Sequence, residues 1–316
     1  MKINEEKANM EKSETIEEIP LACCDELAAV EFLEKRLWKG EPHCHHCESA
    51  NVYQMKDSKG QRNKRFLWRC HDCKDQFTVR MGTVFEESRI PLRHWCYAFW
   101  RMATSKKGVS ALEIKRHTQI SYKSALFLMH RVRFGITQDP AGAAKMTGTV
   151  ECDETYIGGK PRPFTGYHKR GRGTSKTPVL GIVQRDGNIH RRVVADVSAA
   201  TLKKAIRECV DTQARIITDE HLAYRGLGKE FSGGHETVNH GTREYARGDV
   251  WTNTAESSFA LIKRGLMGVY HAVSKKHLHR YLGEFDFRWN TRKMNDGQRT
   301  TLAIESAFGK RLIMQP

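Results

Sequence analysis

Three acidic residues lie where their side chains could bind metal ions. Asp153 is in an alternating, strand-like run, Asp219 ends an apolar run, and Glu256 lies just inside a helix opened by residues 252–254. A carboxylate at the end of a buried strand is unfavourable unless a positive charge neutralises it. Hard divalent cations prefer oxygen ligands, so three carboxylates on converging elements indicate a site for such ions.

Each of these acids alone also has a simpler explanation. Asp153 could be a surface residue of its strand, and Asp219 could begin a turn. Asn253-x-x-Glu256 matches a capping box, so Glu256 could serve only to close the start of its helix. The metal-site hypothesis therefore rests on the three acids together.

The charge of the chain indicates a polyanionic partner. The 53 Lys and Arg residues exceed the 37 Asp and Glu residues, giving a net charge of +16 and a pI near 9.5. Residues 1–34 hold ten acids and three bases, so the remainder carries +23. A basic body fits a nucleic acid, which is also a natural substrate for carboxylate-bound divalent ions.

Basic residues near the acids are candidate phosphate contacts. Between Thr155 and Gln184 the chain has no acid, and its Gly and Pro residues indicate a flexible loop. Such a loop should hold backbone phosphates without reading base sequence. The loop candidates are Lys160, Arg162, Lys169, Arg170 and Arg172.

The helix that carries Glu256 has two further candidates. Lys263 follows Glu256 by seven residues, so both project from nearly the same helix face, about 10 Å apart along the axis. Lys263 could hold a flanking phosphate while Glu256 binds metal, or it could be solvated. Arg264 is the adjacent candidate.

Four of the nine cysteines have the spacing of a zinc site. They form two Cys-x-x-Cys pairs, Cys44 with Cys47 and Cys70 with Cys73, separated by 22 residues. A two-residue gap turns both thiolates of a pair toward one tetrahedral ion. Short strand-like runs between and after the pairs indicate a zinc ribbon with a structural Zn²⁺. Histidines beside the first pair are alternative ligands; these are His43, His45 and His46.

Other features indicate an intracellular protein. The sequence has no apolar run long enough to span a bilayer, and its first twenty residues lack the apolar centre of a signal peptide. In a reducing compartment, cysteines at metal-ligand spacing bind metal rather than form disulfides. We therefore expect a cytoplasmic location and no membrane partner.

Residues 92–135 have the pattern of a helix-turn-helix. Ser110-x-x-Glu113 matches a capping box that opens a helix, and a short break at residues 119–120 precedes a helix over residues 122–133. That last helix has polar and basic residues over an apolar back, as a DNA-reading helix needs. Lys123 and Arg131 are its candidate DNA contacts, and a hairpin with a solvated basic face is the alternative.

The last segment has the element order of a ribonuclease-H-like domain. The Asp153 strand is followed by a hairpin over residues 179–197, a helix over residues 202–210, the Asp219 strand and a long interrupted helix over residues 256–292. This order places the first and fourth strands side by side, so we predict a mixed α/β fold. Two Mg²⁺ ions, or Mn²⁺, held there could activate a nucleophile and stabilise the leaving oxygen of a phosphodiester.

These patterns predict four regions. Residues 1–18 form a disordered acidic tail, residues 19–86 a helix and zinc ribbon, and residues 87–138 a helix-turn-helix. Residues 149–309 form the ribonuclease-H-like catalytic domain.

Taken in order, the motifs resemble the ISXO-like group of bacterial insertion-sequence transposases. The resemblance runs from about residue 28 to residue 292, and a co-linear set of this kind is far more specific than any one member. Besides the first cysteine pair, the segments that carry it are residues 69–77, 82–86, 105–111, 150–159, 238–240, 252–256 and 281–290.

The resemblance implies a nucleoid-associated DDE transposase that cuts and rejoins double-stranded DNA. It would bind the terminal inverted repeats of an insertion sequence, join them to target DNA, and act as a homodimer or larger synaptic assembly. Asp153, Asp219 and Glu256 align with the family's catalytic triad, and Lys263 aligns with its downstream basic residue. The four cysteines match its zinc ribbon.

One residue departs from the family pattern and leaves alternatives open. Trp251 stands where the family often has a histidine before Thr-Asn. A DNA-binding regulator that has lost catalysis would bind element ends without a metal-dependent product. A metal-dependent nuclease would release hydrolysed fragments rather than joined strands.

Overall fold

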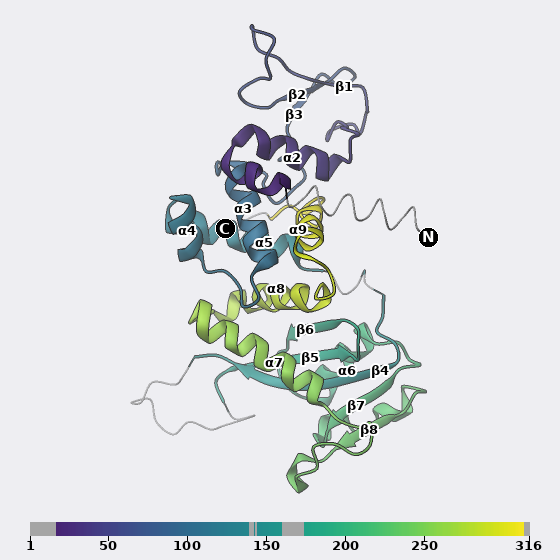
Figure 1. Ribbon diagram of the computed structural model, residues 1–316. Helices are drawn as coiled ribbons and strands as arrows, with labels where there is room; N and C mark the ends of the chain where they lie inside the picture. The colour runs from purple at the N-terminus through teal and green to yellow at the C-terminus, as the bar shows by residue number, and fades with distance from the viewer. Residues whose placement is uncertain (1–16, 139–141, 143, 160–173, 313–316) are drawn as a thin grey trace. The chain divides into compact units, whose positions relative to one another are not determined.

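The chain forms two compact units. The computed structural model describes residues 17–138, 142, 144–159 and 174–312 (Figure 1). The first unit comprises Met1–Ile136 and Lys293–Pro316, and the second comprises Thr137–Arg292. Within the described ranges, no helix has both the length and the apolar character that crossing a membrane requires.

The second unit is built on a five-stranded mixed sheet. Its order is β6 (Ile189–Val193), β5 (Thr177–Gln184), β4 (Thr149–Ile157), β7 (Arg215–Asp219) and β8 (His235–Val238). The β4–β5 and β5–β6 pairs are antiparallel, whereas β4–β7 and β7–β8 are parallel. This arrangement confirms the predicted ribonuclease-H-like order and adds β8, which the short run at residues 235–238 did not reveal.

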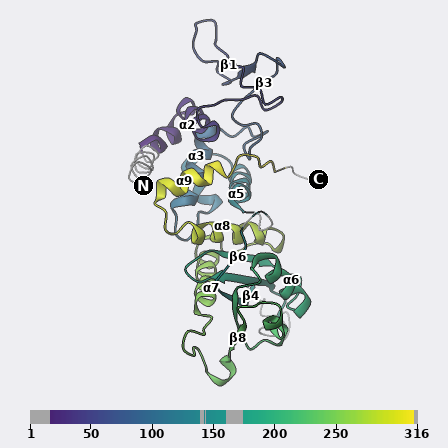
Figure 2. The same ribbon diagram turned by 90° about the vertical axis from the view of Figure 1, so that its right-hand side faces the viewer.

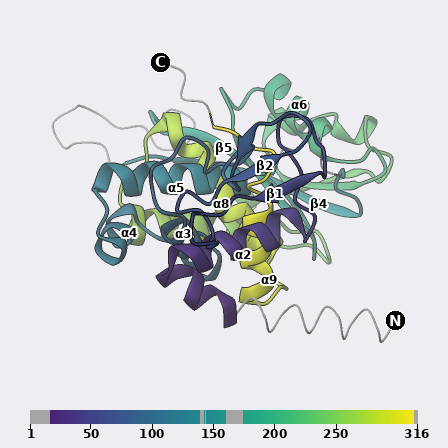
Figure 3. The same cartoon turned by 90° about the horizontal axis from the view of Figure 1, so that it is seen from above.

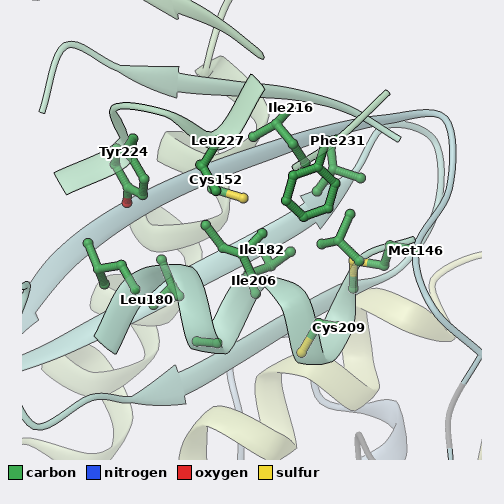
Figure 4. Packing of buried hydrophobic residues seen from close by; sticks show 14 of the residues in the cluster. Met146, Cys152, Leu180, Ile182, Ile206, Cys209, Ile216, Tyr224, Leu227 and Phe231 are labelled. Atoms are coloured by element: carbon green, nitrogen blue, oxygen red, sulfur yellow. The ribbon is translucent and has the colours of Figure 1, made fainter. Parts of the chain in front are cut away.

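Helices cover both faces of this sheet, as Figure 2 shows for α6 (Ala199–Cys209) and α7 (Asn253–Gly265). Even-numbered side chains of β4 and β5, such as Cys152 and Ile182, pack with α6 in one apolar core (Figure 4). Odd-numbered ones, such as Val179, pack with α7 and α8 (Leu278–Asn290) in another. This alternation follows the two-residue period of a strand.

A glycine lets α7 approach the sheet closely. Gly181 on β5 is the register partner of Asp153 on β4. A Cβ atom at Gly181 would lie 2.7 Å from the Phe259 ring of α7. The absence of a side chain there therefore brings the helix that carries Glu256 down onto the strands beside Asp153.

After α7 the chain is irregular before α8 begins. A π-helical turn at Leu266–Tyr270 and a 3₁₀ turn at Lys275–His277 break the predicted long helix near the expected positions. On α8, Tyr281 and Phe285 are buried, so their four-residue spacing reflects core packing.

The first unit contains the predicted ribbon. Its strands β1 (Val52–Gln54), β2 (Trp68–Cys70) and β3 (Gln76–Phe77) form an antiparallel sheet in that order. Phe77 and the edges of Trp38 and Trp68 pack beside the buried Cys44 and Cys70. Such a small apolar cluster is typical of a fold that depends on a bound metal.

The rest of the described part of this unit is mostly helical. Besides a helical segment over residues 17–24, it has α2 (Glu26–Trp38), α3 (Leu92–Thr104), α4 (Ala111–Thr118), α5 (Tyr122–Ile136) and α9 (Asp296–Glu305). The Ser110 hydroxyl caps α4, Gln119 adopts a left-handed conformation in the turn, and Ser121 caps α5. The two short helices and their tight turn thus form where the helix-turn-helix was predicted.

The C-terminal helix packs with the first unit. Figure 3 shows α9 beside α2 and α3, and α9 contacts α2, α3 and α5. Residues 293–309 were expected to belong to the catalytic domain, but their contacts place them with the N-terminal helices. At the other end, residues 17 and 18 of the predicted tail are helical, and Glu18 pairs with Lys35 and Arg36 at 2.7 and 2.8 Å.

Candidate active site

The sheet brings Asp153 and Asp219 together. In the parallel β4–β7 pair, Val150 is opposite Ile216 and Glu151 is opposite Ile217, and Asp153 and Asp219 each follow two residues later. Asp153 accepts a hydrogen bond from the Glu154 backbone at 2.8 Å. Asp219 accepts one from the His221 backbone at 3.0 Å. Ordinary strand pairing thus makes neighbours of two acids that are distant in sequence.

Glu154 adds a third carboxylate to this pair. One oxygen from each of Asp153, Glu154 and Asp219 lies within 4.8 Å of the others. The Tyr224 hydroxyl donates to Glu154 at 2.8 Å, and His221 Nε2 lies 3.7 Å from its other oxygen. Glu154 was not among the candidate metal ligands, but its position makes it part of the cluster.

The electrostatics of Asp153 fit a cation site. Burial, and then the negative charges of Glu154 and Asp219, raise the pKa of Asp153 to about 8; Glu256 contributes a smaller increase. Carboxylates this close repel one another unless a cation lies between them. An all-oxygen donor set fits Mg²⁺ or Mn²⁺.

Glu256 comes to the site from α7. The capping box that was the alternative explanation for Glu256 is not formed, because the helix begins with Asn253 itself, after Thr252. The Glu256 side chain is 51% exposed and lies 3.4 Å from His240 Nε2. The backbone N–H of His240 donates to Glu220 at 3.0 Å, so the residue after Asp219 holds the His240 backbone. Its charge contributes to the raised pKa of Asp153, but Glu256 is not among the three carboxylates that lie within 4.8 Å of one another.

The four predicted cysteines form a second metal-binding cluster. Their sulfur atoms all lie within 4.8 Å of one another, with Cys44–Cys73 at 3.5 Å and Cys47–Cys70 at 3.6 Å. A zinc tetrahedron with bonds of ~2.3 Å has sulfur–sulfur edges of ~3.8 Å, so the spacing fits Zn²⁺. The set does not include the neighbouring histidines.

Comparison with known proteins agrees with both clusters. Residues 145–290 match the ISXO2-like transposase domain, and residues 24–76 match the transposase zinc-ribbon domain. A protein of Halobacterium salinarum, described as an uncharacterized protein in transposable element ISH50, is 31% identical over 280 residues, which cover 83% of this chain and 90% of that protein. The chain belongs to the ISXO2-like transposase family.

A solved structure is similar to this transposase at lower identity. It is the crystal structure of the Mos1 strand transfer complex, with 12% identity over 60% of this chain and 73% of that chain. The TM-score is 0.23, which is too low to support any argument.

The residues of this transposase that were predicted to contact DNA differ in their exposure to solvent. Lys123 at the start of α5 is exposed, as are Lys263 and Arg264 on α7. The predicted loop contacts lie outside the described residues; these are Lys160, Arg162, Lys169, Arg170 and Arg172.

Arg131 was predicted to contact DNA, but its side chain is buried. It is 6% exposed, and its guanidinium donates to the Val84 and Glu86 carbonyls and lies 4.5 Å from the Phe127 ring. All of these partners belong to the first unit. Arg131 therefore stabilises this unit from a buried position and does not lie on its exposed surface.

Sequence patterns missed several residues around the acids. Glu151 precedes Asp153 by two residues and is fully buried, and Arg185 donates to it at 2.8 Å. His240 lies in a motif that carried the family resemblance, but nothing in the spacing indicated its contact with Glu256. The alternation of β4 could have identified Glu151, because an acid on the Asp153 face of a buried strand needs a partner.

Proposed function

We propose that this protein is a DDE transposase that cleaves the ends of an insertion sequence and joins them to target DNA. The observation that carries the proposal is the position of Asp153 beside Asp219 on β4 and β7. Glu256, in the first turn of α7, supports it because its charge contributes to the raised pKa of Asp153. Asp153, Asp219 and Glu256 would hold two Mg²⁺ ions, and Glu154 would support the aspartates. Bound Mg²⁺ would activate the attacking water or 3′-hydroxyl and stabilise the leaving oxygen.

The protein groups around the acids would orient DNA. Lys263 is exposed two turns after Glu256 on α7, which suits it to hold a phosphate beside the scissile bond. Arg264 and the basic residues of the 160–172 segment would add sequence-independent phosphate contacts. His240 would keep the Glu256 carboxylate directed toward the aspartates, because its imidazole lies 3.4 Å away.

The first unit would recognise the element ends. Lys123 is at the exposed start of α5, where the second helix of a helix-turn-helix meets the major groove. The zinc ribbon, with Zn²⁺ on its four cysteines, would extend this surface. We infer that two or more copies hold two element ends in a synaptic assembly, and that the protein acts on the nucleoid in the cytoplasm.

Strand transfer with purified protein tests the proposal. The substrate is an oligonucleotide that carries the inverted repeat flanking this gene, together with plasmid target DNA and Mg²⁺. Wild-type protein should produce joined strands, and Asp153→Ala should produce none while it still binds the oligonucleotide. Joining by Asp153→Ala would refute the site, and hydrolysed fragments without joining would indicate a nuclease.

A further inference from the structure

Glu151 is a buried carboxylate with no part in the proposed metal binding. It lies on β4 two residues before Asp153, so both side chains project from the same face. One oxygen accepts hydrogen bonds from the backbone N–H groups of Thr254 and Ala255, at 2.9 and 3.0 Å. The other accepts from the Thr254 hydroxyl at 2.9 Å. A single residue of β4 therefore holds the first turn of α7.

This contact provides α7 with the cap that its own sequence does not form. The Thr252 side chain, at the N-cap position, makes no capping hydrogen bond. The first N–H groups of a helix have no partner within it, and they attract negative charge. Because Glu151 supplies both the acceptor and the charge, Glu256 is not needed as a cap and stays available to the site.

Arg185 and Trp251 complete the arrangement. Arg185 donates to Glu151 at 2.8 Å, to the Asp249 carbonyl at 2.6 Å and to the Trp251 carbonyl at 3.0 Å. Its guanidinium also lies 4.1 Å from the centre of the Trp251 ring. The arginine thus neutralises the buried carboxylate and fixes the segment that leads into α7. Trp251, which departs from the family pattern, has a defined partner here.

We propose that Glu151, Arg185 and Trp251 form a positioning group that sets Glu256 relative to Asp153. The inference rests on the proposed function, because it concerns how Glu256 reaches an ion shared with Asp153. The group would provide no ligand atom and acts through the α7 backbone. Metal ligands must be held to within about 0.5 Å, and loss of a supporting partner typically lowers metal affinity by about 10–100-fold.

The test is the Mg²⁺ dependence of end cleavage by Glu151→Gln. Glutamine keeps the size and one acceptor oxygen but removes the charge that Arg185 and the helix start need. We expect the half-saturating Mg²⁺ concentration to rise about tenfold or more, with oligonucleotide binding unchanged. Trp251→Leu keeps Glu151 and Arg185, so it should raise that concentration by a smaller factor.

Glu284→Gln is the matched control. Glu284 is also fully buried and paired with an arginine, Arg288, but it accepts from Tyr270 and joins α8 to the turn after α7. This variant should lose stability and keep the wild-type Mg²⁺ dependence.

The outcomes separate this inference from the proposed function. If Glu151→Gln shifts the Mg²⁺ dependence no more than Glu284→Gln, the inference is wrong. If Glu151→Gln does not fold, an unshifted Mg²⁺ dependence in Trp251→Leu overturns it instead. No Mg²⁺-dependent cleavage by wild-type protein would overturn the proposed function and this inference with it.

Discussion

Asp153→Asn should make the Mg²⁺-free protein more stable while it abolishes cleavage. Asparagine keeps the oxygen that accepts from the Glu154 backbone but removes a charge from the acidic cluster. At pH 9, above the pKa of about 8 of Asp153, two unit charges 4.8 Å apart, the limit for these oxygens, repel by about 3 kcal/mol at an effective dielectric of ~20. We therefore expect the free energy of unfolding of the second unit to rise by about 2–3 kcal/mol without Mg²⁺.

Mg²⁺ should reverse which of the two proteins is more stable. At a concentration of ~1,000 times its dissociation constant, an ion that binds only the folded state stabilises it by about 4.1 kcal/mol. Wild-type protein should gain this amount, and Asp153→Asn should gain little. Hydrogen exchange of peptides from β4 and β7 reports on the second unit alone. The zinc-loaded protein must be used without chelator, because a chelator would also remove zinc from the ribbon.

Asp286→Asn is the control for the charge argument. Asp286 pairs with the buried Arg191 at 2.6 Å, so removing its charge leaves an arginine without its counter-ion. This variant should lose about 3 kcal/mol both with and without Mg²⁺. If Asp153→Asn were also less stable than wild-type protein without Mg²⁺, or gained as much from Mg²⁺, the acids would not form a repulsive cation site.

Four other residues give separate predictions. Cys73→Ser should lose the bound zinc, measured by a colorimetric zinc assay; full zinc content would contradict the four-cysteine site. Lys123→Ala should weaken binding to element ends and lower by about 1 the slope of the log binding constant against log salt concentration. Arg131→Met should instead lower Tm and leave that slope unchanged. Equal slopes for the two variants would argue against this distinction. Gly181→Ala should lower the free energy of unfolding, measured in urea, by about 1–3 kcal/mol, because its methyl group would lie 2.7 Å from the Phe259 ring. A variant as stable as wild-type protein would show that α7 is not held so closely.

Local signals in the sequence explain which parts of the fold were predictable. Ser110 and Ser121 cap their helices as the sequence indicates, and Asp186 adopts the positive φ expected in the turn between β5 and β6. Each of these features depends on a few neighbouring residues. The cysteine spacing was equally informative, since each pair of thiolates is set by one tight turn.

Contacts between distant segments explain the rest. Arg131 is a basic residue on a helix that was expected to read DNA. It is buried, however, and donates to the carbonyls of residues 84 and 86. Glu154 joins the cluster because β4 pairs in parallel with β7 and so passes beside the end of β7 at Asp219. Glu151 caps a helix that is distant along the chain. Such partners come from tertiary packing, which the spacing of residues along one segment does not encode.

Diffraction from crystals of the DNA complex soaked in Mn²⁺ tests the central claim most directly. Anomalous scattering locates Mn²⁺ independently of any assumption about its ligands. We predict two Mn²⁺ peaks next to the scissile phosphate, with Asp153 and Asp219 bound to one ion and Glu256 bound to the other. Peaks that avoid these three carboxylates, in a complex where the DNA end is engaged, would contradict the account.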